Sequence, residues 1–404
     1  MGARIMMTPN DRTILRELAK KQQAFASLPI MQEREQMWLN HNELIGNDVP
    51  IHFEVGTFER ELIPALQTTT DIARSIELSL HRNMLNHLHI GDDRVVPKTF
   101  DIAWHVKFVP FGIEVSTQHA EGNAFKFNHV IQNLEADFYK LKPAIISCDK
   151  EHTLKEKEIV EDAIGDILTV RIVNGYALAV SATQEIVKLM GMSEMYMALY
   201  DYPQLFSKMM EKLTEAYINF FRFLKNEELL AANNGNDWLG QGSFGFYRKQ
   251  LLWGYADSQE TESISPEAFC EFFFPIYKRI AAEFELFSYG CCEPVHQIWE
   301  SCLCKLTNLR KLSISPWCDE EYMGTMLKDT NVIFHRKPSP NYVGVDRVLD
   351  ENGFSKHIEK TLRAAQGCKL EIAFRDVLTT AGDTTKPRRA VEITRKQINK
   401  YWGK

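Results

Sequence analysis

The chain has 404 residues, of which 45% are hydrophobic and 25% are charged, a composition typical of a globular protein with a sizeable core. Its net charge of -7 and its pI near 6.0 provide no broad basic surface, so we expect no nucleic-acid partner. The apolar runs are far shorter than the ~18 residues that a membrane-spanning helix needs, and no signal-peptide pattern opens the chain. We therefore expect a cytoplasmic protein that has no membrane partner.

The first hundred residues have a mostly polar, helical pattern. Thr8-Pro9-Asn10-Asp11 resembles a helix N-terminus, with a capping residue ahead of a proline at the first helical position. From Phe100 onward, short apolar runs alternate with amphipathic stretches. This change predicts two parts, a helical N-terminal extension over residues 1–99 and an α/β domain over residues 100–404.

The α/β domain is predicted from strand-like runs that alternate with helices. A long helix begins at 201–203, with Leu205, Phe206, Met209, Leu213, Tyr217, Phe220 and Leu224 on one face. Short strands that alternate with helices favour a parallel sheet, and no Gly-rich dinucleotide motif is present, so we predict a TIM (β/α)8 barrel. The expected strands lie at 102–115, 144–146, 171–180, 228–232, 286–289, 309–314, 332–334 and 370–374.

Cysteines are concentrated in one part of this predicted barrel, because five of the eight fall between Cys291 and Cys318. In a barrel, the loops that follow the strands converge at one end, so polar residues just past a strand are candidate site residues. The predicted strand that ends at Tyr289 is followed by Gly290, by two cysteines and by Glu293. Thiols and carboxylates are zinc ligands, which makes Cys291 a candidate ligand. The alternative is that these cysteines are small buried core residues. We expect Cys302 and Cys304 to serve packing in a helix.

Further polar residues follow other predicted strands. The loop 233–242 offers Asp237, Trp238 and Gln241 for hydrogen bonds to a substrate, although its Asn and Gly residues also suit a simple turn. Gln259 precedes a helix and is either a polar contact in the pocket or part of a helix cap. Lys337 is a candidate anion contact, and charged residues in such places are also commonly solvated. We expect His105, which flanks a strand, to be structural.

Together these stretches resemble the uroporphyrinogen decarboxylase superfamily, whose members share a TIM-barrel fold. The resemblance covers roughly residues 100–400. It is carried by 191–203 with Leu199, Asp201 and Pro203, and by Ser258-Gln259-Glu260, Ser265-Pro266, Tyr289-Gly290-Cys291-Cys292-Glu293-Pro294, Asn308-Leu309-Arg310, Ser315-Pro316-Trp317-Cys318-Asp319 and Arg336-Lys337-Pro338. The true decarboxylases carry an N-terminal Arg-Gln-Ala-Gly-Arg pattern that has no counterpart here, so the resemblance favours the cobalamin-linked methyltransferase branch.

That branch holds zinc with a His-x-Cys pair after one strand and a Cys after a later strand. Here Tyr289-Gly290-Cys291 takes the place of His-x-Cys, and Asp376 lies near the position of the last Cys. The resemblance therefore implies an altered zinc ligand set, drawn from Cys291, Glu293, Cys318 and Asp376. It also implies a cobalamin that is carried by a separate corrinoid protein, since the chain lacks the Asp-x-His-x-x-Gly pattern of cobalamin carriers.

The resulting hypothesis is a zinc-dependent transfer of a methyl group between the corrinoid protein and a small methyl ether, amine or thiol, as in O-demethylation. Zinc would polarise the heteroatom, and Asp237, Gln259 and Tyr289 would orient the substrate, with Trp238, Gln241 and Lys337 binding it. Two alternatives remain at this stage. One is a metal-free decarboxylase that uses Asp237 or Asp376 as charge stabiliser with Arg336, Lys337 or Arg375 as carboxylate clamp. The other is a non-catalytic barrel that binds a ligand.

Overall fold

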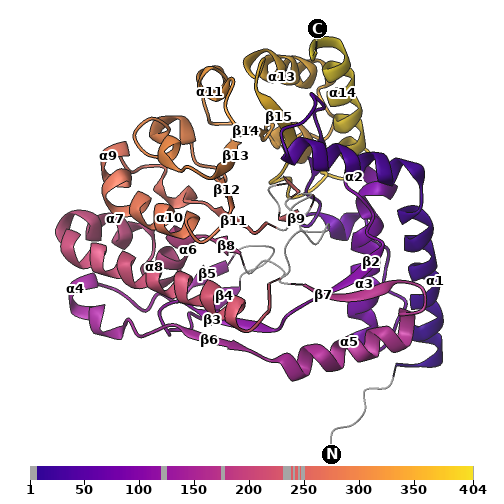
Figure 1. The fold of residues 1–404 in the computed structure, drawn as a ribbon, viewed down its shortest axis with the longest axis horizontal. Coiled ribbons are helices and arrows are strands. Elements are labelled where there is room, and N and C mark those ends of the chain that lie inside the picture. Colours follow the sequence, from indigo (N-terminus) through magenta and orange to yellow (C-terminus); the bar gives the residue numbers. More distant parts are fainter. Residues whose placement is uncertain are drawn as a thin grey trace, which may run out of the picture.

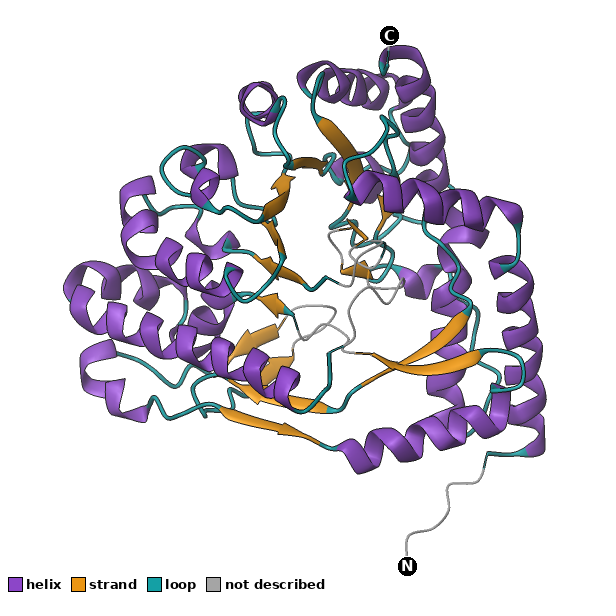
Figure 2. Ribbon diagram, viewed as in Figure 1, coloured by secondary structure: helices purple, strands orange, loops and turns teal. Residues whose placement is uncertain are grey.

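A computed structural model describes residues 7–119, 125–173, 178–230, 238–239, 242–243, 246 and 251–403. Its centre is a parallel sheet of seven strands in the order β1-β15-β14-β13-β12-β11-β8. Figure 2 shows that the sheet curls, with helices on its outer side. The strands are β1 (Ile51–Phe53), β8 (Ala179–Val180), β11 (Trp253–Ala256), β12 (Leu286–Tyr289), β13 (Leu309–Ile314), β14 (Ile333–Arg336) and β15 (Lys369–Phe374).

The α/β class and a barrel-like curled sheet are thereby confirmed. The sheet begins earlier than expected, because β1 pairs in parallel with β15 through Ile51 and Ile372. This strand lies inside the segment that the sequence pattern assigns to a helical extension.

The outer edge of β1 is covered by side chains rather than by another strand. Asp93 accepts a hydrogen bond from the Ile51 N–H at 2.8 Å, and Asp92 accepts one from the Phe53 N–H at 2.7 Å. Burial raises the pKa of Asp92 to about 6. The two carboxylates thus pair backbone N–H groups at the edge of β1 that would otherwise lack a hydrogen-bond partner.

The remaining strands form two-stranded ladders beside the curled sheet. β2 runs parallel to β7, whereas the other three ladders are antiparallel. Within the described ranges, the sheet is therefore a curled seven-stranded arc with a β2·β7 ladder next to it. The ladders are β2 (Thr99–Ala103) with β7 (Thr169–Val173), β3 (Val106–Val109) with β6 (Ile145–Cys148), β4 (Thr117–His119) with β5 (Phe125–Phe127), and β9 (Trp238–Leu239) with β10 (Gly242–Ser243).

Helices surround the sheet (Figure 1). The Thr8 cap is confirmed, since its hydroxyl accepts from the Asp11 N–H at 3.0 Å. The helices are α1 (Pro9–Ala26), α2 (Pro29–Asn42), α3 (Asp71–Leu85), α4 (Leu134–Asp137), α5 (Lys150–Ile164), α6 (Ala182–Met190), α7 (Met192–Asp201), α8 (Pro203–Asn226), α9 (Pro266–Ala268), α10 (Phe274–Ala281), α11 (Glu320–Leu327), α12 (Asn341–Gly344), α13 (Glu351–Ala364) and α14 (Lys386–Tyr401).

Helix α8 shows where periodicity predicts well and where it fails. Six of the seven residues expected on its inner face are buried, and Leu205 is half-buried. The strand expected at 228–232 does not begin there, because Glu228 lies in a turn with φ of +58°. Residues 231 and 232 lie outside the described part of the chain.

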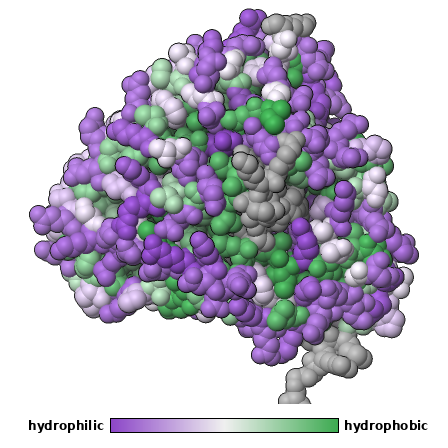
Figure 3. Space-filling view, in the orientation of Figure 1, coloured by the Kyte–Doolittle hydropathy of each residue, from purple (hydrophilic) through white to green (hydrophobic). Residues whose placement is uncertain are grey.

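Two further features concern the surface and the cysteines. On the face seen in Figure 3, hydrophilic residues cover much of the periphery. Across the described ranges, no helix combines the length and the apolar character that crossing a membrane requires. Cys302 was expected to pack in a helix, but it lies in a turn and forms a disulfide with Cys270.

Candidate functional site

The backbone of Cys291 is the meeting point of three strands at the carboxyl end of the sheet. Cys291 follows β12, and its carbonyl accepts hydrogen bonds from the Lys337 ammonium at 2.9 Å and from the Ser313 hydroxyl at 3.1 Å. Ser313 lies on β13, and Lys337 directly follows β14. The residues that follow β12 and β14 therefore meet at Cys291 and Lys337.

A glycine turn sets the position of Cys291. Gly290 has φ of +101°, and an added Cβ would lie 3.1 Å from Ser313 Cβ and 3.2 Å from Val295 Cγ1. Only glycine adopts this backbone conformation without strain. The sharp turn brings the two thiols that follow it to the carboxyl end of the curled sheet, which is called the mouth below.

The two thiols form a short chain of ligand-type atoms with a carboxylate. Cys291 Sγ lies 3.6 Å from Cys292 Sγ, and Cys292 Sγ lies 3.6 Å from Asp376 Oδ2. Asp376 follows β15 and has φ of +63°, a strained conformation for a residue with a side chain. Cys291 is buried and Cys292 is half-buried. Sulfur and oxygen atoms from two separate strand ends therefore lie together.

Electrostatics favour the thiolate form of Cys291. The hydrogen bond from Cys292, followed by the positive charges of Lys337 and Arg375, lowers the pKa of Cys291 to about 5 despite its burial. The pKa of Cys292 is raised, because it keeps the proton that the pair shares. One negative charge at neutral pH thus resides on the Cys291 sulfur.

Arg375 is held in place by carboxylates from two strand ends. Its Nε lies 3.0 Å from Glu54 Oε2 and 3.8 Å from Asp376 Oδ1. Burial raises the pKa of Glu54, against the opposing effect of the arginine. Glu54 directly follows β1, so this ion pair joins the carboxyl ends of β1 and β15, the two neighbouring strands at one edge of the sheet.

Glu293 supports the loop through both of its carboxylate oxygens. Oε2 accepts from the Cys291 N–H at 2.8 Å, and Oε1 accepts from the Ser258 N–H at 2.9 Å. Burial, then the charges of Asp257 and Cys291, raise the pKa of Glu293 to about 7. This geometry suits a residue that fixes the cysteine loop more than a metal ligand.

Asp257 is a buried acid that sequence reasoning missed. Its Oδ2 accepts from the Tyr255 hydroxyl at 2.7 Å, and its Oδ1 has no hydrogen-bond partner within the described part of the chain. Burial raises its pKa to about 6, and the charge on Cys291 adds to the effect. The available signal was its place directly after the apolar run 251–256.

The other predicted site residues are placed as follows. Tyr289 is fully buried, where its hydroxyl bonds Ser258 and its ring meets Tyr277 edge-on at 5.3 Å. Gln259 is half-buried beside Glu260. Cys318 is buried, and burial raises its pKa to about 11.

Three predicted substrate contacts cannot be placed in this way. Asp237 and Gln241 lie outside the described residues. For Trp238, the structure describes the backbone in β9 and not the side chain.

A second charged cluster lies deeper in the curled sheet. Glu371 on β15 lies 3.0 Å from the Lys311 ammonium and 2.5 Å from His335 Nδ1, and His41 Nε2 approaches it at 2.9 Å. Although burial acts in the opposite direction, Lys311 and His335 hold the pKa of Glu371 well below its usual range. All four side chains are buried, so we assign this cluster a structural role within the sheet.

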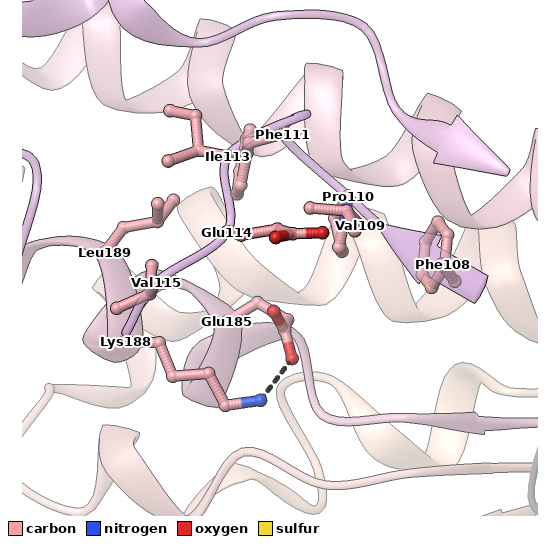
Figure 4. A pocket seen from close by; sticks show the side chains of 10 residues that line it. All are labelled: Phe108, Val109, Pro110, Phe111, Ile113, Glu114, Val115, Glu185, Lys188 and Leu189. Atoms are coloured by element: carbon pink, nitrogen blue, oxygen red, sulfur yellow. Dashed lines mark hydrogen bonds and ion pairs between the residues drawn. The ribbon is translucent and has the colours of Figure 1, made fainter. Parts of the chain in front are cut away.

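A separate hollow of about 270 Å³ lies between β3, the segment that follows it, and α6 (Figure 4). Its charged groups are already paired: Lys188 lies 2.6 Å from Glu185, and Glu114 pairs with Lys107. The hollow therefore offers space without a reactive group.

Comparison with known proteins supports the fold. No known family profile matches the chain, and no curated protein matches its sequence. Among solved structures, a methyltransferase from Methanosarcina mazei is similar with a TM-score of 0.51 and 12% identity, over 92% of this chain and 99% of that one. At this identity the similarity shows a shared fold.

Proposed function

We propose that this chain is a methyltransferase that moves a methyl group between a small methylated substrate and a corrinoid protein. The observation that carries the proposal is the position of the Cys291 thiol after β12, 3.6 Å from the Cys292 sulfur, which in turn lies 3.6 Å from Asp376 after β15. The hydrogen bond from Cys292 and the nearby charges of Lys337 and Arg375 lower the pKa of Cys291. The fold shared with a methyltransferase from Methanosarcina mazei supports the same reading. The substrate class is a methyl ether, amine or thiol.

The donor types at the mouth are ones that zinc accepts, although a bound ion would have to draw the three side chains closer together, since their ligand atoms are not all within 4.8 Å of one another. Cys291, Cys292 and Asp376 offer two sulfurs and a carboxylate within a chain of 3.6 Å contacts, a combination that this borderline-soft ion accepts. We narrow the proposed ligand set to these three residues, because both oxygens of Glu293 accept backbone N–H groups. Cys318 is left out because its buried thiol already interacts with the backbone of His296 and Val295. A bound zinc would supply Lewis acidity toward the substrate heteroatom.

The chain's own residues supply charge and a proton. Lys337 and Arg375 keep Cys291 ionised, and Glu293 fixes the loop that carries it. When a methyl group leaves an ether oxygen for reduced cobalt, the oxygen must take up a proton to become an alcohol. Asp257 Oδ1 is proposed to deliver that proton, since a pKa of about 6 lets it donate near neutral pH.

The rim of the mouth carries apolar side chains that suit a protein partner. Trp317, Val345, Val348 and Leu378 are each more than half exposed and lie in the loops after β13, β14 and β15. Exposed apolar groups that gather around a site are typical of interaction surfaces. They support the docking of a corrinoid protein over Cys291.

One observation favours a second candidate, a metal-free decarboxylase. Lys337 and Arg375 are two cations near Cys291, as a carboxylate substrate would require, and this substrate would have to displace the Cys291 carbonyl from Lys337 and share Arg375 with Glu54. Arg336 does not belong to this clamp, because it is buried and its guanidinium bonds the Ile314 and Ser315 carbonyls and Glu320. Release of CO2 from a small acid, without any change at cobalt, would select the decarboxylase. A chain that binds a ligand and does neither would be a binding protein.

Elemental analysis tests the metal part of the proposal. Among proteins produced with added zinc, the Cys291→Ser variant should contain about one zinc per chain less than the unsubstituted protein, because a neutral hydroxyl replaces a soft thiolate. The matched control is Cys368→Ser, a buried cysteine whose thiol bonds the Gly324 carbonyl on α11. Cys302 is unsuitable as a control because it forms a disulfide. Equal zinc content in Cys291→Ser and Cys368→Ser would overturn the assignment.

A further inference from the structure

Two histidines and a glutamate converge at a second place, on α5 and the segment that joins β2 to β3. The ligand atoms of His105, His152 and Glu156 all lie within 4.8 Å of one another. His105 Nε2 lies 2.7 Å from Glu156 Oε2, and the two imidazole rings meet edge-on with centroids 4.2 Å apart. We propose that this trio binds a divalent first-row transition cation of the zinc class and clasps the β2–β3 segment to α5.

The ligand types and their number suit such an ion. Imidazole nitrogen and carboxylate oxygen are common zinc ligands, and two histidines with one acid leave coordination positions for water. A tetrahedral zinc with bonds of about 2.0–2.1 Å holds its ligand atoms about 3.3 Å apart. Atoms that already lie within 4.8 Å reach that spacing through small rotations of two exposed histidine side chains and one half-buried glutamate.

Local structure brings the three residues together before any ion binds. His152 and Glu156 are four residues apart on α5 and therefore lie on one face of the helix. The backbone of His105 is tied to the first turn of that helix at both ends. Its N–H donates to Thr153 Oγ1 at 3.1 Å, and its carbonyl accepts from the Asp149 N–H at 2.9 Å.

The surrounding charges leave the trio available to a cation. The lysines of α5 form ion pairs elsewhere: Lys150 with Glu227, Lys155 with Glu151 and Lys157 with Glu161. The imidazole rings of His105 and His152 meet with centroids 4.2 Å apart, so a single ion can bind a nitrogen of each ring. A simple His105–Glu156 ion pair is the competing reading, and it leaves His152 without a role.

The clasp is distinct from the cysteine site. β3, β6 and α5 lie along the lower part of Figure 1, whereas β12 to β15, which carry the cysteine mouth, lie in its upper half. The bound ion would fasten a loop to the start of a helix where two hydrogen bonds already hold it. The inference therefore stands whether or not the proposed methyl transfer is correct.

The test uses the full chain with the Cys291→Ser substitution, so that the cysteine site contributes no zinc. Titration calorimetry with Zn²⁺ alone should show one site in this background. Adding His152→Ala or Glu156→Gln should weaken binding by at least about tenfold, since even second-shell losses cost about 10–100-fold. Adding Glu158→Gln, an equal charge change at an exposed position of α5, should leave the affinity unchanged.

Two further readouts separate a clasp from incidental binding. Co²⁺ in the Cys291→Ser protein should give d–d absorption without the intense sulfur charge-transfer band that a cysteine ligand produces. Zn²⁺ should also slow amide hydrogen exchange in residues 104–107 and 150–156. The inference is overturned if Cys291→Ser protein takes up no Zn²⁺, if Glu156→Gln binds like Glu158→Gln, or if Co²⁺ shows a sulfur band in this background.

Discussion

The ionisation of Cys291 can be measured by its reaction with iodoacetamide across pH, in protein freed of metal with a chelator. The hydrogen bond from Cys292 is the largest of the effects that lower the pKa of Cys291 to about 5. The Cys292→Ala variant deletes that bond and leaves Lys337 and Arg375 in place. We expect the midpoint of the rate against pH to rise by several units, toward the ordinary thiol value of about 8.5.

The midpoint of the alkylation rate against pH, and not the rate at pH 7, distinguishes a Cys291 of low pKa from one of ordinary pKa. At pH 7 a thiol with a pKa of 5 is about 99% ionised and one with a pKa of 8.5 is about 3% ionised, a ratio of about 30. The thiolate of lower pKa is the weaker nucleophile, and with a Brønsted slope of about 0.45 the difference of about 3.5 units lowers its reactivity about 40-fold. The two factors nearly cancel at pH 7.

Mass spectrometry of the alkylated peptide assigns the reaction to Cys291. Replacing Lys337 by Met should move the midpoint upward by less than Cys292→Ala does, because its charge is a smaller contribution than the hydrogen bond. A wild-type midpoint at pH 8 or above would refute the reasoning, as would a Cys292→Ala midpoint equal to that of the wild type.

Two further predictions concern stability. In urea unfolding, Lys311→Met should cost about 3–5 kcal/mol because it leaves Glu371 buried without its ammonium partner. Lys155→Met, at an exposed ion pair, should leave the stability nearly unchanged; a loss under 1 kcal/mol at Lys311 would contradict the buried-charge account. Asp92 has its pKa raised to about 6 by burial, so the folded state holds a proton that the unfolded state releases near pH 4, and stability should fall as pH rises from 4 to 6. Asp92→Asn should remove about 3 kcal/mol of that decline, and parallel curves for wild type and variant would count against it.

Sequence reasoning worked where the pattern is local. β12 to β15 are short segments rich in apolar residues that end in glycine or polar residues, and α8 keeps its apolar face from Phe206 to Leu224. The position of Cys291 directly after a strand, and of Asp376 after another, follows from those runs. Their linkage through Cys292 is visible only in the fold, because the two segments are 84 residues apart.

Other features depend on pairing between distant segments and left no clear pattern. β1 is three residues long and lies between helices, so its pairing with β15 and the role of Glu54 were not foreseen. The strand expected at 228–232 is apolar enough, but α8 runs into a turn at Glu228. The Cys270–Cys302 pairing joins residues whose proximity comes from tertiary packing.

The function expected of a side chain also depends on what already contacts it. Glu293 has the residue type of a metal ligand, yet both of its oxygens accept backbone N–H groups. Tyr289 has a polar tip that suits substrate binding, yet it is buried against Ser258. For His105 the sequence favoured a structural role, and the proximity of His152 and Glu156 became evident only from the packing of α5.

The measurement that tests the central claim most directly is the cobalt absorbance of a corrinoid during methyl transfer. The zinc-supplied protein is mixed with a corrinoid protein or methylcobalamin, and a thiol, an aryl methyl ether and a methylamine are added in separate reactions. We expect one of these substrate classes to change the absorbance between that of methylated and that of unmethylated cobalt. Cys291→Ser should abolish that change, and Cys368→Ser should retain it. No change with any of the three classes, or equal rates in Cys291→Ser and Cys368→Ser, would contradict methyl transfer at this site.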